Sequence, residues 1–218
     1  MEKNCKYILW DLDGTLTDPM IGITTCVQYA LRHLGIEVKD LQELCPFIGP
    51  PLLDSFQEFY RLSEAQAQEA ILKYRERFAT VGWLENEVYP GIPELLRDLK
   101  ASGVRIAVAT GKPTVFSEQI LEHFGLRQYI DVVSGIPLDR EPLDKCEVIL
   151  HALYEMGISD RSGCVMVGDR SHDAIGAKMA RIDFIGVLYG YGSRDELEAE
   201  GTDAIADSVA ALLSLLLS

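Results

Sequence analysis

The sequence predicts an α/β fold in which helices cover both faces of a parallel sheet and one all-helical segment is inserted. Short apolar runs alternate with amphipathic helical patterns along most of the chain, which is typical of a parallel sheet buried on both faces. Between residues 18 and 85 the sequence shows no convincing strand. We therefore expect an α/β core formed by 1–16 and 86–218, and a helical domain formed by 17–85.

The chain has 218 residues, enough for one domain with a substantial insertion. Its net charge of −14 argues against general binding to nucleic acid polymers or to anionic membranes, because both need basic surfaces. The five cysteines are scattered and form no Cys-x-x-Cys pair, which indicates reduced thiols. No signal peptide precedes the first strand, and the apolar run at 209–217 is shorter than the about 20 residues that span a bilayer. We expect a cytoplasmic protein.

The first predicted strand ends in two acidic residues and a glycine. Ile8-Leu9-Trp10 is a run of large apolar residues, as expected for a strand buried on both faces. Asp11 and Asp13 follow at the edge where open α/β sheets bind ligands, and Gly14 permits the chain to bend there. Two neighbouring carboxylates repel each other unless a cation neutralises them or one is protonated. Mg²⁺ is the expected cation because it prefers oxygen ligands.

The inserted segment shows helical spacing of its apolar residues. Helices are expected at about 23–34, 52–59 and 63–81. Two adjacent prolines break the pattern in the loop 47–52. Ser63 is a candidate N-cap, with Gln66 at the capping-box position.

The rest of the chain alternates between helix and strand. Helices are expected between 91 and 103, from 113 to 123, at 143–156 and 171–180, after 193 and from 207, and strands at 104–109, 130–133, 164–167 and 184–188. Together with the first strand, they predict a Rossmann-like, doubly wound parallel sheet.

Three of these strands end in polar residues that suit one reaction. Asp11 and Asp13 follow the first strand, Thr110-Gly111-Lys112 follows the second, and Asp169 follows the fourth. The carboxyl ends of parallel strands lie on one edge of the sheet. A carboxylate nucleophile, a second carboxylate for acid–base work and positive groups are what phosphoryl transfer requires.

The string Asp-Leu-Asp-Gly-Thr-Leu-Thr-Asp at 11–18 resembles the first motif of the haloacid dehalogenase-like phosphatases. Candidates for the other three motifs of that superfamily follow in the same order. The resemblance implies that Asp11 is a nucleophile that becomes an aspartyl-phosphate. It implies that Asp13 protonates the leaving alkoxide and activates water, and that Mg²⁺ is held by Asp11, the backbone carbonyl of Asp13 and Asp169. The helical insertion resembles the cap of these enzymes.

The same resemblance implies how phosphate is bound. Thr110 and the amide of Gly111 would bind phosphate oxygens, and Lys112 is either a substrate contact or a solvated side chain. Lys145, in the first turn of a helix, is the preferred phosphate-binding cation, with Arg140 as the alternative.

Other polar residues near these motifs have supporting or neutral interpretations. Asp173 is expected to orient Lys145 or a metal-bound water rather than to bind metal directly. His172 is expected to face solvent in a loop. The glycines at 186–192 lack the dinucleotide-binding spacing and are assigned no site.

The expected partner is a small phosphorylated metabolite. The chain resembles phosphoglycolate phosphatases in layout, whereas the loop 48–52 and the third motif are closer to a 5′-nucleotidase-like branch. The stretch 47–56 contains no Lys or Arg for a second anion and offers apolar residues such as Phe47 for a nucleobase, although Phe56 suits the cap core better. We therefore expect a nucleoside monophosphate to be the better substrate. A phosphomutase of the same superfamily and a catalytically silent binding domain are the alternatives.

Overall fold

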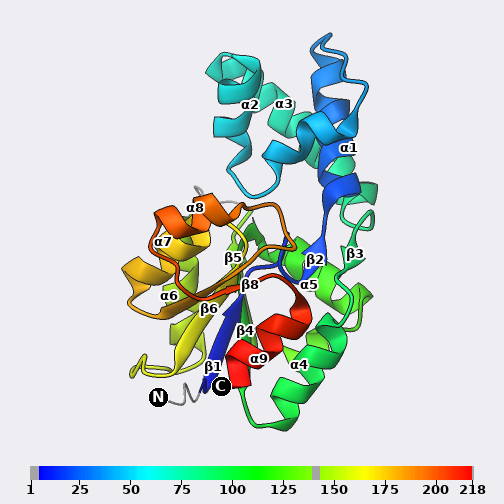
Figure 1. Ribbon diagram of the computed structural model, residues 1–218. Helices are drawn as coiled ribbons and strands as arrows, with labels where there is room; N and C mark the ends of the chain where they lie inside the picture. The colour runs from blue at the N-terminus through cyan, green and yellow to red at the C-terminus, as the bar shows by residue number, and fades with distance from the viewer. Residues whose placement is uncertain (1–4, 139–142, 218) are drawn as a thin grey trace. The chain divides into compact units, whose positions relative to one another are not determined.

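The computed structural model describes residues 5–138 and 143–217 (Figure 1). The chain forms two compact units. Unit 1 comprises Met1–Thr17 and Val88–Ser218, and unit 2 comprises Asp18–Glu87.

Unit 1 contains a six-stranded sheet in the order β5-β4-β1-β6-β7-β8, with every neighbouring pair parallel. The strands are β1 (Tyr7–Trp10), β4 (Arg105–Pro113), β5 (Val132–Ile136), β6 (Cys164–Gly168), β7 (Asp183–Val187) and β8 (Ile205–Ala206). In the central strand β1, Ile8 pairs with Ile106 of β4 and with Val165 of β6. The predicted doubly wound α/β fold is confirmed.

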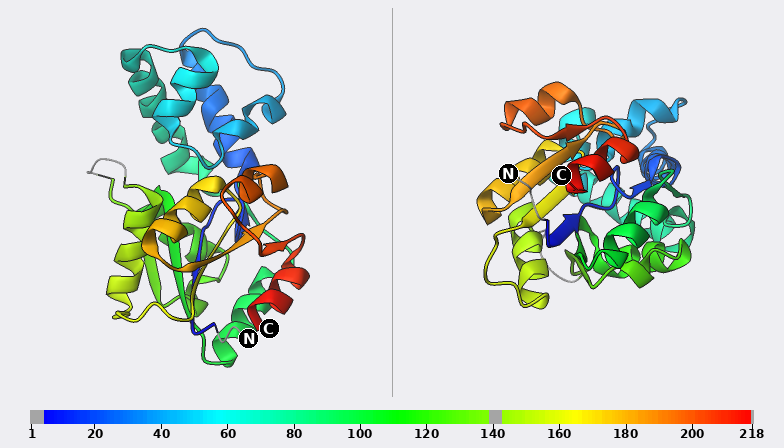
Figure 2. Two further views of the ribbon diagram at one scale, coloured as in Figure 1. Left: turned by 60° about the vertical axis from the view of Figure 1, so that its left-hand side comes forward. Right: turned by 60° about the horizontal axis from the view of Figure 1, so that its bottom comes forward.

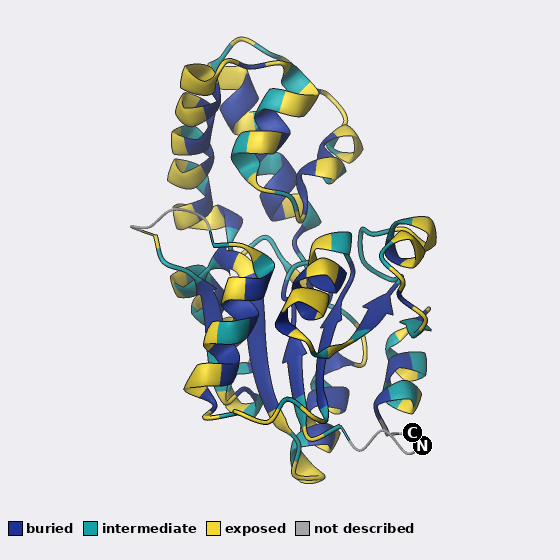
Figure 3. Ribbon diagram, turned by 90° about the vertical axis from the view of Figure 1, so that its left-hand side faces the viewer, coloured by how far each residue is buried: buried dark blue, intermediate teal, exposed yellow. Residues whose placement is uncertain are grey.

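Helices cover both faces of this sheet, as Figure 2 shows from the side. One face carries α6 (Lys145–Glu155) and α7 (Ser171–Ala180), and the other carries α4 (Ile92–Ala101), α5 (Thr114–His123) and α9 (Val209–Leu217). The short helix α8 (Arg194–Ala199) packs beside α7. The strands are buried between helices whose outer faces are exposed (Figure 3). Burial of this apolar surface is the main force that holds the two layers on the sheet.

The strands β4 and β8 differ from the sequence prediction. So do β2 (Thr17–Asp18) and β3 (Glu87–Val88), which were not predicted, and β5, which was expected at 130–133. The strand β4 continues to Pro113, with a register shift against β5 between Ala109 and Pro113. The strand β8 was not predicted, because a two-residue strand carries no detectable alternation. The extension of β4 matters for the site, since it includes Thr110-Gly111-Lys112.

Unit 2 is built from helices, as predicted. Its elements are α1 (Met20–His33), the 3₁₀ segment η1 (Leu41–Phe47), α2 (Leu52–Tyr60), α3 (Glu64–Arg77) and the π-helical turn η2 (Phe78–Gly82). The predicted capping box is present, because Ser63 and Gln66 exchange side chain and backbone hydrogen bonds at the start of α3. The helices α1 and α3 pack together. Among the described helices, none has the length and apolar character to cross a membrane.

The chain leaves unit 1 at β2 (Thr17–Asp18) and returns to it at β3 (Glu87–Val88). Within unit 1, the N–H of Tyr89 donates to the carbonyl of Leu16 at 3.2 Å. Within unit 2, the N–H of Gly22 donates to the carbonyl of Glu85 at 2.9 Å. In each unit, a backbone hydrogen bond therefore joins the segment that leads to the other unit with the segment that returns from it.

Candidate active site

The two acids of the first motif lie where β1 ends. The N–H of Asp11 still donates to the carbonyl of Val167 at 2.9 Å, and the chain then turns at Gly14, whose φ is 83°. A Cβ at Gly14 would lie 2.3 Å from Oδ2 of Asp169. Glycine is needed here for two reasons, since the backbone has a left-handed conformation and the carboxylate of Asp169 fills the adjacent space.

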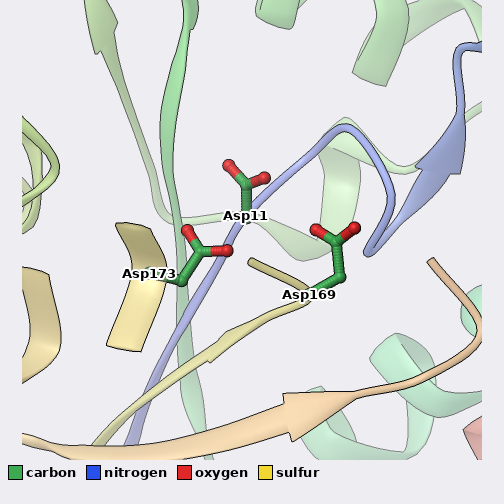
Figure 4. Close-up of side chains that lie close together, drawn as sticks. All are labelled: Asp11, Asp169 and Asp173. Atoms are coloured by element: carbon green, nitrogen blue, oxygen red, sulfur yellow. The ribbon is translucent and has the colours of Figure 1, made fainter. Parts of the chain in front are cut away.

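Three buried carboxylates meet at this edge of the sheet (Figure 4). Asp11 follows β1, Asp169 follows β6 and Asp173 comes from the first turn of α7. Each offers an oxygen within 4.8 Å of an oxygen from the other two. Burial, together with the charges of Asp173 and Asp11, raises the pKa of Asp169 to about 8. Without a cation, this cluster is therefore electrostatically strained.

Lys145 provides a positive charge at the cluster. Its Nζ lies 2.6 Å from Oδ1 of Asp11 and 2.7 Å from Oδ1 of Asp173. The N-cap Asp144 and Glu147 exchange hydrogen bonds in a capping box, which fixes Lys145 as the first residue of α6. Burial opposes the charge of this lysine, but the two carboxylates hold its pKa above the ordinary value.

Lys112 contacts the second acid of the motif. Its Nζ donates to Oδ2 of Asp13, and its side chain is 5% exposed, so it is not a solvated side chain. Burial raises the pKa of Asp13, against the opposing effect of the Lys112 ammonium.

The charges of these residues favour a divalent cation. The four carboxylates of the site, from Asp11, Asp13, Asp169 and Asp173, face the two ammonium groups of Lys112 and Lys145. With all four carboxylates ionised, two negative charges would remain uncompensated in a buried place, where an unpaired charge costs several kcal/mol. The raised pKa of Asp169 reflects this cost. Carboxylate oxygens are the ligands that Mg²⁺ prefers. The residues present therefore fit a Mg²⁺ ion.

The predicted phosphate-binding segment lies at the end of β4. Thr110 is buried, and its Oγ1 accepts a hydrogen bond from the N–H of Lys112 at 3.2 Å. The side of Gly111 on which a Cβ would stand is open. The hydroxyl proton of Thr110 can still be donated to another acceptor. Binding of phosphate by these two residues stays a prediction.

Three other residues were named from the sequence, and each has a different outcome. Phe47 belongs to unit 2, where its ring packs edge-on against Phe56 and Phe59, so its contacts are those of a core side chain. Arg140 lies outside the described residues. His172 is exposed as expected, but it stands in the first turn of α7 and not in a loop.

The loop that follows β7 contacts Asp169, although it was not predicted to belong to the site. The N–H of Tyr191 donates to Oδ2 of Asp169 at 2.7 Å, and a Cβ at Gly190 would lie 2.5 Å from the same oxygen. The hydroxyl of Tyr189 donates to the carbonyl of Thr15 at 3.1 Å. The sequence could have indicated that this loop belongs to the site, because the glycine-rich loop also follows the carboxyl end of a parallel strand.

Comparisons with known proteins agree with this geometry. Residues 8–187 match the family model described as haloacid dehalogenase-like hydrolase. The chain is 47% identical over 209 residues to a protein named 5′-nucleotidase from Pseudomonas aeruginosa, covering 96% of this chain and 94% of the relative. It is 39% identical over 201 residues to a protein named tyrosine-protein kinase PtkA from Mycobacterium tuberculosis, covering 92% of this chain and 68% of the relative.

A solved structure extends the comparison to three dimensions. The crystal structure of a predicted phosphatase from Clostridium acetobutylicum has a TM-score of 0.92 and 46% identity, covering 97% of this chain and 98% of that one. The resemblance recognised in the motifs is confirmed: this chain is an enzyme of the haloacid dehalogenase-like hydrolase family.

Proposed function

We propose that this phosphatase is a Mg²⁺-dependent phosphomonoesterase that hydrolyses a nucleoside monophosphate through an aspartyl-phosphate on Asp11. The observation that carries the proposal is the position of the Asp11 carboxylate. It lies at the carboxyl edge of the sheet, 2.6 Å from the Lys145 ammonium and beside Asp169 and Asp173. A nucleophile that attacks a phosphate dianion needs nearby positive charge, because reactant and nucleophile repel each other.

The reaction has two balanced steps. An oxygen of Asp11 forms a bond to phosphorus while the bond between phosphorus and the leaving oxygen breaks, and that oxygen takes a proton from Asp13. Water then attacks phosphorus while Asp13 accepts its proton, and the bond between phosphorus and Asp11 breaks. The products are the alcohol, inorganic phosphate and the original carboxylate.

Charge stabilisation would come from both the protein and a bound metal ion. Lys145 would neutralise an oxygen of the transferring phosphoryl group, and Thr110 and Gly111 would donate to others. Asp11, Asp169 and the backbone carbonyl of Asp13 would hold Mg²⁺. When bound, the ion supplies positive charge to the phosphoryl oxygens.

The substrate class is supported by two observations. The Pseudomonas aeruginosa relative, at 47% identity, is named 5′-nucleotidase. In unit 2 the stretch 47–56 contains no Lys or Arg for the second anion of phosphoglycolate. Within this stretch Phe47, Ile48 and Phe56 are buried, whereas Pro50, Pro51 and Leu52 keep surface that a nucleobase could contact.

The chemistry is tested by the exchange Asp11→Asn, which is nearly isosteric. This variant should fold normally and lose turnover, and beryllium fluoride with Mg²⁺ should bind covalently only to the unaltered protein, as followed by fluorine NMR. Asp160→Asn, an exposed carboxylate between α6 and β6, is the matched control. Turnover by the Asp11→Asn variant at the unaltered rate would reject the nucleophile.

The substrate is tested by kcat/KM over a panel of nucleoside monophosphates, phosphoglycolate and sugar phosphates. A nucleoside monophosphate should rank first, and phosphoglycolate above every nucleotide would overturn the assignment. Retention of the phosphoryl group on a substrate isomer would indicate a mutase. Phosphorylation of a tyrosine peptide from ATP would indicate the activity in the name of the Mycobacterium tuberculosis relative.

A further inference from the structure

Each acid of the Asp-x-Asp motif holds a different lysine. Lys145 lies against Asp11, and Lys112 donates from Nζ to Oδ2 of Asp13. The proposed chemistry uses Lys145 but gives Lys112 no task. We propose that Lys112 is the positioning residue for Asp13, holding Oδ2 so that Oδ1 is the oxygen that exchanges a proton with the leaving group. This inference rests on the proposed function.

The two oxygens of the Asp13 carboxylate have different surroundings. Oδ2 receives the charge-assisted hydrogen bond from Lys112. Oδ1 is enclosed and accepts no hydrogen bond within the described part of the chain. Buried polar atoms in native proteins nearly always have a partner. Since Lys112 occupies Oδ2, Oδ1 is the oxygen that remains for exchange of a proton with the substrate.

This arrangement works in both protonation states of Asp13. A protonated carboxyl group donates through one oxygen and accepts through the other, whereas an ionised one accepts through both. The Lys112 ammonium can donate to Oδ2 in either state. The proton therefore resides on Oδ1 and is given to the leaving oxygen from that atom.

The backbone of Lys112 is held on two sides. Its N–H donates to Oγ1 of Thr110 at 3.2 Å, across the register shift in β4. On the other side, a Cβ at Gly135 would lie 2.5 Å from the carbonyl oxygen of Lys112, so β5 approaches as closely as a glycine allows. A lysine anchored on a strand in this way places its ammonium more precisely than one on a loop.

The leaving group distinguishes positioning of an acid from binding of phosphate. The 5′-oxygen of a nucleoside leaves as a strongly basic alkoxide and needs a proton, whereas p-nitrophenolate is stable as an anion. Loss of a well-placed general acid should therefore slow only the first ester severely. Loss of a phosphate-binding cation should slow both, because both carry the same phosphoryl group.

We would measure kcat/KM, which reports all steps up to departure of the leaving group, for a nucleoside 5′-monophosphate and p-nitrophenyl phosphate. Lys112→Met should reduce it by roughly 100-fold for the nucleotide, as expected for a displaced catalytic group. The loss for p-nitrophenyl phosphate should be below about fivefold, since that ester needs no acid. Lys112→Arg, which keeps a charged donor, should recover part of the nucleotide activity. Lys178→Met, at an exposed lysine of α7, should behave as the unaltered protein.

Equal losses for the two esters would overturn the inference and assign Lys112 to phosphate binding or to the fold alone. Unchanged rates for both would overturn it as well. If thermal unfolding shows that Lys112→Met does not fold, Lys112→Gln keeps an N–H donor and allows the same comparison. Inactivity of the unaltered protein toward both esters would reject the proposed function, and this inference with it.

Discussion

The Nζ of Lys145 lies 2.7 Å from Oδ1 of Asp173, at the contact between the first turns of α6 and α7. The same ammonium contacts Asp11 at 2.6 Å. Asp173 also accepts a hydrogen bond from the N–H of Arg170 at 3.1 Å, so its carboxylate is fixed by its own helix. Asp173 therefore holds the lysine against Asp11, and one of its oxygens lies within 4.8 Å of an oxygen of Asp169.

The first prediction follows from this contact. Lys145→Ala should reduce kcat/KM by roughly 1000-fold, because it removes charge stabilisation in the transition state. Asp173→Asn should cost about 10- to 100-fold, as is usual for a residue that orients a catalytic group. Steady-state kinetics on both variants gives the ranking. A larger loss for Arg140→Ala than for Lys145→Ala would show that the third motif was misplaced.

A second prediction concerns the metal-free protein and pH. The pKa of Asp169 is raised from its ordinary 3.8 to about 8, so the folded state binds a proton that the unfolded state releases. This contribution to stability is fully present below about pH 4 and is lost as pH rises through about 8. In EDTA, Tm should therefore fall over this range, and Asp169→Asn should raise Tm at pH 8 by removing the charge.

The same measurement of Tm also tests whether the protein binds Mg²⁺. Mg²⁺ should raise Tm of the unaltered protein more at pH 8 than at pH 6. At pH 6 the ion must displace the proton of Asp169, whereas at pH 8 this carboxylate is more often ionised and can bind the ion directly. Asp169→Asn should lose both this increment and the activity. A lower Tm for Asp169→Asn in EDTA at pH 8 would contradict the electrostatic argument.

A third prediction uses the close approach of α7 to Lys145. A Cβ at Gly176 would lie 2.8 Å from Cβ and Cγ of Lys145, a distance that real atoms do not tolerate. Gly176→Ala should displace the lysine and reduce kcat by roughly 100-fold, the cost of a small misplacement near the reaction centre. Ile175→Ala, at the neighbouring exposed position, serves as control. Assays well below Tm separate displacement from unfolding, and unchanged kcat would show that the helices adjust without moving Nζ.

The fourth prediction tests whether unit 2 selects the substrate, which remains a prediction from the sequence. Leu52→Lys places a cation at the start of α2, in the stretch that otherwise has none. It should increase kcat/KM for phosphoglycolate relative to a nucleoside monophosphate, mainly through KM, since a second anion gains a partner. Leu72→Lys, at a leucine that is 65% exposed in α3, should leave the ratio unchanged. Identical ratios for the two variants would argue that residue 52 does not meet the substrate.

The fold was predictable because its signals are local. Apolar runs, helical spacing and caps such as Ser63 depend on a few neighbouring residues, and parallel topology then brings strand ends to one edge. The two-residue strand β8 was not predictable, because pairing with β7 and not its own sequence makes it a strand. The late part of β4 was missed because Thr110-Gly111-Lys112-Pro113 is polar and ends in proline, which is unusual in a strand.

The pairing of lysines with carboxylates in the site depends on contacts between residues that are far apart in the sequence. The sequence indicates that carboxylates and lysines gather at one edge, but Lys112 and Asp13 are 99 positions apart. Which acid each lysine meets is decided by the register shift in β4 and by the packing of α6 on α7, neither of which is visible as a motif. The loop at Tyr191 was missed for a related reason, because its glycines are explained by the carboxylate of Asp169 and not by their own spacing.

Two backbone hydrogen bonds join the segments where the chain passes between unit 1 and unit 2, and they have a consequence for how the inserted unit can change. Unit 1 joins Leu16 to Tyr89 through its own contact, and unit 2 joins Gly22 to Glu85 through its own. The inserted unit 2 therefore begins and ends at neighbouring points of unit 1. The length of the insertion can therefore change without altering the chain path at the edge of the sheet where Asp11, Asp169 and Lys145 meet. If unit 2 selects the substrate, as predicted above, such changes would alter specificity while the carboxylates and the lysine of unit 1 keep their positions.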